Sequence, residues 1–168
     1  VLLASEAEAP PARTLYLRRA LGVGGEPAVA LETVRGEVTA AALAAHDVVV
    51  LDDARPPRGG MARRLAEWVA AGGGLVVVAG DRARGGDWEG DLAGVRAASV
   101  GDVVDRMNDR GGRLGTLDRS HPVLEPFAAP RSGNFSAPRF FRYRALAPAE
   151  GAATVARWDD GSPALVER

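Results

Sequence analysis

The chain has 168 residues, enough for one domain with a real core. Its composition is ordinary for a folded protein, with 46% hydrophobic and 26% charged residues, and its net charge of −1 gives no general attraction to nucleic acid or to an anionic membrane. Cysteine is absent, which excludes disulfides, thiol nucleophiles and thiolate metal sites.

The first two-thirds of the chain alternates short apolar runs with amphipathic segments, the pattern of βαβ units around a parallel sheet. Because the strands are continuously apolar, we expect helices to cover both faces of the sheet. Right-handed crossovers favour the spatial strand order 2-1-3-4. The expected elements are strands at 1–4, 28–34, 47–51 and 75–79, with helices at 11–21, 39–45 and 57–71 between them.

The helix predicted over 57–71 has the clearest pattern, since Met61, Leu65 and Trp68 recur at helical spacing and the three glycines at 72–74 end it. We expect Trp68 to be buried against the sheet. Beyond Gly80 the chain becomes rich in glycine and proline and turns to β-structure. There the segments 154–158 and 164–167 flank Asp159-Asp160-Gly161-Ser162, a hairpin signal.

Ligands of open parallel sheets bind beyond the carboxyl ends of the strands. The side chains expected there are Glu6 after the first strand, Asp52 and Asp53 after the third, and Asp81 after the fourth. Such carboxylates can bind a divalent cation, but loop carboxylates exposed to water give the same pattern, and we assign no metal and no cofactor. His121, in Ser120-His121-Pro122, completes the candidate crevice, although anchoring a turn through its ring nitrogens is the favoured interpretation. We assign no catalytic residue.

Several motifs in order carry a resemblance to a known family. They are Asp47-Val-Val-Val-Leu51, Gly72-Gly73-Gly74-Leu75-Val76-Val77 followed by Gly80-Asp81, Leu117-Asp118-Arg119-Ser120-His121-Pro122, and Arg157-Trp158-Asp159-Asp160-Gly161-Ser162-Pro163. Together they resemble the class I glutamine amidotransferase-like domains of BatA-type bacterial membrane proteins. True amidotransferases place a cysteine at or beside Asp81 and a His–Glu pair late in the domain, so the resemblance does not carry that activity over.

The resemblance implies a flavodoxin-like, three-layer α/β sandwich, a mostly parallel sheet and a β-rich C-terminal part. It also implies a bacterial membrane-associated parent in which flanking segments, absent from this soluble fragment, reach the membrane and the domain is extracytoplasmic. We therefore expect 1–168 to be a single α/β domain, cut from a longer protein at core strands and lacking its last strand.

The leading functional hypothesis is a non-enzymatic interaction or scaffolding domain with a protein partner and no nucleic acid. One alternative is a hydrolase or sugar-processing enzyme of amidotransferase-like fold, which requires Glu6, Asp52, Asp81 and His121 to meet in one pocket. The other is a small-ligand sensor that uses the same crevice.

Overall fold

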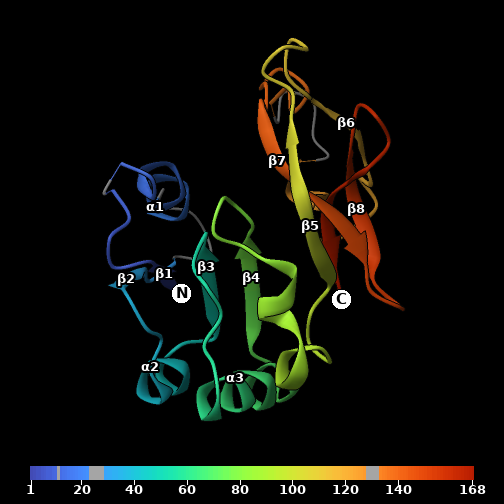
Figure 1. Ribbon diagram of the computed structural model, residues 1–168. Coiled ribbons are helices and arrows are strands. Elements are labelled where there is room, and N and C mark those ends of the chain that lie inside the picture. Colours follow the sequence, from blue (N-terminus) through green and yellow to red (C-terminus); the bar gives the residue numbers. More distant parts are fainter. Residues whose placement is uncertain (11, 23–28, 128–132) are drawn as a thin grey trace. The chain divides into compact units, whose positions relative to one another are not determined.

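A computed structural model describes residues 1–10, 12–22, 29–127 and 133–168 (Figure 1). The chain divides into two compact units, Val1–Val95 and Arg96–Arg168, which we call the N-terminal and C-terminal units and describe separately. The fold is mixed α/β, with a parallel four-stranded sheet in the first unit and antiparallel sheets in the second. That residues 1–168 form one domain stays a prediction.

The N-terminal unit is built on a parallel sheet of order β2-β1-β3-β4, which confirms the predicted order. The strands are β1 (Leu2–Ser5), β2 (Glu32–Arg35), β3 (Val48–Asp52) and β4 (Gly74–Val78). Strands β1 and β3 are almost wholly buried and form the centre of the core. The second strand begins later than its apolar pattern predicted, and the predicted start at residue 28 lies outside the described residues.

Three helices connect these strands: α1 (Leu15–Gly22), α2 (Ala40–Ala45) and α3 (Gly60–Ala70). Thr39 caps α2 as predicted, because its hydroxyl accepts a hydrogen bond from the N–H of Ala42 at 3.2 Å. The first helix starts at Leu15 rather than 11, so Arg13 lies in the turn before it. None of the helices in the described residues is both long and apolar enough to cross a membrane.

Two expectations about packing were wrong. Trp68 is only partly buried: its indole lies over Gly73, where a Cβ atom would come within 2.4 Å of the ring. The glycines after α3 therefore provide a surface for this ring as well as ending the helix. The edge strand β4 is not covered on both faces, since the successive residues Val76 and Val77, which point to opposite faces, are 47% and 37% exposed.

The C-terminal unit contains two antiparallel sheets. One pairs β5 (Ala98–Asp105) with β7 (Arg142–Pro148), and the other has the order β6-β8-β9, from β6 (Leu114–Leu117), β8 (Ala153–Trp158) and β9 (Pro163–Glu167). The predicted hairpin is present as β8 and β9, and Gly161 supplies the positive φ of +85° that its turn requires. The chain also forms a short 3₁₀ turn, η3 (Glu125–Phe127).

Candidate functional site

The carboxyl ends of β1, β3 and β4 bring together the predicted acidic side chains of the N-terminal unit. The chain runs from β1 outward to β2 and then returns to β3 on the other side of β1, so the strand order switches between β1 and β3. Ser5 and Asp52 are register partners across this switch, and both are buried. The candidate crevice therefore lies where ligands of such sheets commonly bind.

Asp53 is the centre of this cluster. It is only 3% exposed, and its backbone takes the left-handed region with φ of 47°, which is uncommon for a residue with a side chain. Its Oδ2 lies 2.7 Å from Nη2 of Arg13, and its Oδ1 accepts a hydrogen bond from the N–H of Arg82 at 2.8 Å. A buried charge is tolerated when it is paired and hydrogen-bonded in this way.

Gly80 makes room for the Asp53 carboxyl group. A Cβ atom at position 80 would lie 2.6 Å from Cγ of Asp53, closer than any side chain allows. The glycine that follows β4 therefore has a steric role here, and the Gly80-Asp81 motif belongs to the packing of the cluster.

The other two carboxylates at the strand ends, Asp81 and Glu6, also have partners within the chain. Arg13 Nη2 lies 3.7 Å from Oδ2 of Asp81, whose side chain is 63% exposed. Glu6 accepts a hydrogen bond from the N–H of Arg55 at 2.9 Å. Arg13 thus pairs with two of the strand-end carboxylates, and Glu6 and Asp53 hold the loops after β3 and β4.

Asp52 lies next to Asp53, whose Oδ2 is likewise buried without a hydrogen bond among the described residues although it pairs with Arg13. Asp52 is 6% exposed, and its Oδ2 is buried without a hydrogen-bond partner in the part of the chain that the structure describes. Burial raises the pKa of Asp52, the charge of Arg13 opposes this rise, and the charge of Asp53 adds to it. Burial therefore disfavours the charged form of Asp52 relative to a carboxyl group in water.

The acidic side chains at the strand ends do not form a metal-binding cluster in the described residues. Among the described residues there is no group of three or more His, Cys, Asp or Glu side chains that could hold one. The guanidinium of Arg13 occupies the position between Asp53 and Asp81 that a cation would take.

His121 lies in the C-terminal unit, in the turn after β6. Its Nε2 is 3.1 Å from Oε2 of Glu167, and its Nδ1 accepts a hydrogen bond from the N–H of Val123 at 3.3 Å. With Nδ1 as the acceptor, Nε2 is the nitrogen that donates to Glu167. Nε2 therefore ties the turn to β9, and Nδ1 closes the turn itself.

Sequence reasoning missed Arg13 as a member of the cluster, because position 13 fell inside the helix predicted over 11–21. A signal was present: Arg13 is the one basic residue between the first strand and the start of α1, on the loop that must cross the strand ends. An arginine placed there faces carboxylates that follow neighbouring strands.

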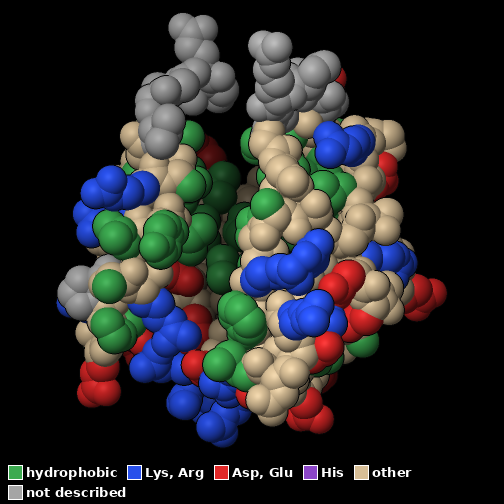
Figure 2. All heavy atoms as spheres, turned by 90° about the horizontal axis from the view of Figure 1, so that it is seen from above, with side chains coloured by type: hydrophobic (Ala, Val, Ile, Leu, Met, Phe, Trp, Pro, Cys, Tyr) green, Lys and Arg blue, Asp and Glu red, His purple; other side chains and the backbone are tan. Residues whose placement is uncertain are grey.

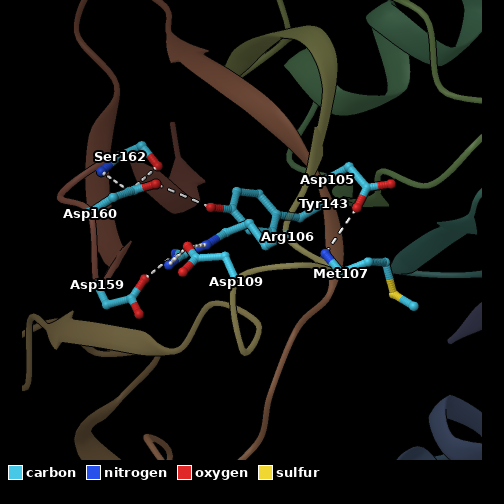
Figure 3. A network of polar contacts seen from close by, with 8 residues as sticks. All are labelled: Asp105, Arg106, Met107, Asp109, Tyr143, Asp159, Asp160 and Ser162. Atoms are coloured by element: carbon cyan, nitrogen blue, oxygen red, sulfur yellow. Dashed lines mark hydrogen bonds and ion pairs between the residues drawn. The ribbon is translucent and has the colours of Figure 1, made fainter.

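A second polar network, also missed, lies in the C-terminal unit around Arg106 (Figure 3). Arg106 donates to Asp109 through Nε at 3.1 Å and Nη2 at 2.8 Å, and to Asp159 through Nη1 at 2.6 Å. Hydrogen bonds with Tyr143, Asp109 and Asp159 raise the pKa of Arg106 above its ordinary value. The network joins the end of β5 to the β8–β9 turn.

The same turn is braced by Asp160. Its Oδ1 accepts hydrogen bonds from the N–H and the hydroxyl of Ser162, at 2.8 and 2.5 Å, and its Oδ2 accepts one from the Tyr143 hydroxyl at 3.1 Å. The Ser162 bonds lower the pKa of Asp160. The Tyr143 ring stacks on Trp158 with centroids 4.3 Å apart, so aromatic packing holds one member of the network in place.

Comparisons with known proteins bear on the fold. No family model and no curated protein matches the chain. Among solved structures, the chain is similar to the cytoplasmic protein STM1381 from Salmonella typhimurium LT2, with a TM-score of 0.69, 18% identity, and coverage of 98% of this chain and 81% of that one. It is also similar to the mmIFT52 N-terminal domain, with a TM-score of 0.58, 14% identity, and coverage of 98% and 83%. At these identities the likeness concerns the fold.

Proposed function

We propose that this chain is a non-enzymatic interaction domain of a bacterial membrane-associated protein, with a flavodoxin-like sheet of the class I glutamine amidotransferase-like type. The observation that carries the proposal is the Arg13 cluster. Its ion pairs with Asp53 and Asp81 place a guanidinium where the crevice would otherwise present free carboxylates. The strand ends, which hold the reactive groups in enzymes of such folds, here tie loops together.

A surface suited to a protein partner lies on α1. Leu15 and Tyr16 are 41% and 82% exposed, and Arg18 and Arg19 beside them are exposed as well. Arg19 follows Leu15 by four residues and Tyr16 by three, so it lies next to both on the helix surface. Tyrosine and arginine are the residue types that most often carry binding energy at protein interfaces.

Figure 2 views the molecule from above and shows hydrophobic side chains next to basic ones on the left, the side where α1 lies in Figure 1. Exposed apolar side chains beside positive charge suit a partner surface that is apolar with acidic groups beside it. We therefore assign the partner to the outer face of α1.

Site-specific photo-cross-linking in living cells tests this proposal. A photoreactive amino acid replaces Tyr16 in the gene's full-length product, and a matched control carries it at Glu67, an exposed position on α3. The proposal predicts a discrete adduct from position 16 that is absent from position 67 and is lost when Arg18→Glu and Arg19→Glu are added. Equal adduct patterns from both positions would contradict it.

A small-ligand sensor is the second candidate, and the buried Asp52 carboxyl group favours it. An Oδ2 without a partner at the strand-order switch is what a hydroxyl-bearing ligand could satisfy after a small movement. A thermal-shift screen of polyols and nucleosides on the wild type and on Asp52→Asn separates the two functions. A stabilisation seen only in the wild type supports the sensor.

A further inference from the structure

A slot lies beside β6 in the C-terminal unit, on a different part of the chain from the α1 surface. It is an open groove with a volume of about 480 Å³, within the range of about 300–1,000 Å³ that ligand sites occupy. All four residues of β6 (Leu114–Leu117) line it, and residues 133–136 form the opposite wall. Arg119 lies at the end where β6 leaves the sheet.

The slot adjoins the backbone edge of β6. Side chains of a strand alternate between its two faces, so a cavity against one face meets every second residue, whereas a cavity along the edge meets all of them. Strand β6 pairs with β8 on one side, with a register irregularity between Leu114 and Thr116. In the described ranges no strand pairs along its other side, where the bridge between Gly112 and Phe140 lies just before β6. The slot therefore lies along an edge that can accept another strand.

The wall opposite β6 is held in place by contacts of its own. The ring of Phe135 meets that of Phe127 edge to face, with centroids 5.2 Å apart. Arg119 Nη1 donates to the carbonyl of Phe127 at 3.1 Å, and Asn134 Oδ1 accepts hydrogen bonds from the N–H and hydroxyl of Ser136. Phe127 of the turn η3 thus contacts both the wall and Arg119 at the exit of β6.

We propose that this slot binds one extended peptide segment, which adds as a strand to the free edge of β6 and places a carboxylate on Arg119. A slot with two walls has room for a single strand, whereas a second copy of this chain would have to bring a whole sheet edge past residues 133–136. A guanidinium has five N–H donors, and the bond to Phe127 uses one of them, so Arg119 can still bind a carboxylate through two others.

The side chains that line the slot determine which peptide side chains it prefers. Phe135 and Leu117 offer apolar contacts, while Thr116 and Asn134 offer polar ones. An extended segment presents its side chains alternately to two sides, so a peptide of alternating apolar and hydroxyl residues matches these walls. Over four residues, such a strand spans about 13 Å.

Fluorescence anisotropy on the whole chain provides the test. The probe is a labelled hexapeptide of alternating valine and threonine with an aspartate at each end. Its controls are the same peptide with lysine ends and the same peptide with alternate backbone nitrogens methylated, which removes the donors needed for strand addition. We expect saturable binding of the aspartate-ended peptide and binding at least about tenfold weaker for both controls.

Two variants locate the site. Arg119→Glu should weaken the aspartate-ended peptide at least about tenfold, whereas Arg113→Glu, the same change just before β6 and outside the slot, should change it less than about twofold. Circular dichroism checks that both variants fold. If Arg119→Glu does not fold, Arg119→Gln replaces it in the binding measurement. Amide NMR shifts should cluster at residues 114–117 and 133–136.

Three results overturn the proposal. The first is that none of the peptides saturates at concentrations on the order of 1 mM, the range of weak recognition. The second is that the methylated peptide binds equally well, and the third is a concentration-dependent dimer whose NMR shifts fall on β6. None of them bears on the α1 surface, because the Tyr16 cross-link is measured separately.

Discussion

The guanidinium of Arg13 lies 2.7 Å from the buried carboxylate of Asp53 and 3.7 Å from that of Asp81. One side chain from the turn before α1 thus holds together the loops that follow β3 and β4. In an α/β sheet these loops form the ligand-binding edge, so this ion pair determines what the edge can do.

Replacing Arg13 with alanine should destabilise the protein by about 2–3 kcal/mol. Removal of one partner from a fully buried pair costs about 3–5 kcal/mol, and the loss is smaller here because a third of the Arg13 side chain is exposed and the N–H of Arg82 still binds Asp53. Urea unfolding measures the change. Arg64→Ala, at an exposed position of α3, is the matched control and should change stability by less than about 0.5 kcal/mol.

Gly80→Ala should cost about 1–3 kcal/mol, the usual range for forcing an extra carbon into a packed site. The new Cβ would lie 2.6 Å from Cγ of Asp53, and that carboxyl group can retreat only by giving up Arg13 or the N–H of Arg82. Gly86→Ala is the control, because nothing lies within 4 Å of a Cβ there and its φ is not positive. Equal stability of the two variants would show that Asp53 is free to move.

The raised pKa of Asp52 should affect how the stability of the protein depends on pH. Because burial raises its pKa in the folded state, the group favours folding while it is protonated, and this contribution is lost as pH rises from the unfolded pKa through the folded one. Asp52→Asn, which stays uncharged, should therefore be more stable than the wild type at pH 7, and the difference should shrink toward pH 4. A wild type that is the more stable of the two at pH 7 would mean that Asp52 is stabilised as a carboxylate.

Arg106→Lys should lower the melting temperature by about 5 °C, the shift expected from losing one or two net hydrogen bonds in a domain of this size. Lysine keeps the charge but lacks the planar fork that binds Asp109 and Asp159 together (Figure 3). Arg113→Lys, a nearby exposed position, is the control for the substitution itself. If both variants melt alike, the network contributes no measurable stability.

Much of the N-terminal unit could be predicted because its signals are local. The short apolar run at Val48–Val50 favours a buried strand, Thr39 is a residue type that commonly caps helices, and right-handed connections leave few strand orders. Glu6, Asp52, Asp53 and Asp81 follow from the strand ends, and the structure brings these four to one edge.

The predictions that failed concern features set by contacts between residues far apart in the sequence. The partial exposure of Trp68 follows from its place over Gly73, and the exposure of Val76 follows from β4 being an edge strand. Arg13 was missed because its role is set by Asp53, forty residues away in the chain, and not by the helical pattern around it. His121 pairs with Glu167 within the C-terminal unit, and its grouping with the crevice stays a prediction.

The central claim, that the strand-end cluster is structural and the domain has no catalytic activity, is tested most directly by a substrate screen. Purified protein and Asp81→Asn are assayed side by side with ester, amide and glycoside substrates, with and without divalent metals. The account predicts the same background rate for both proteins with every substrate. Turnover by the wild type that disappears in Asp81→Asn would contradict it and make Asp81 a catalytic residue.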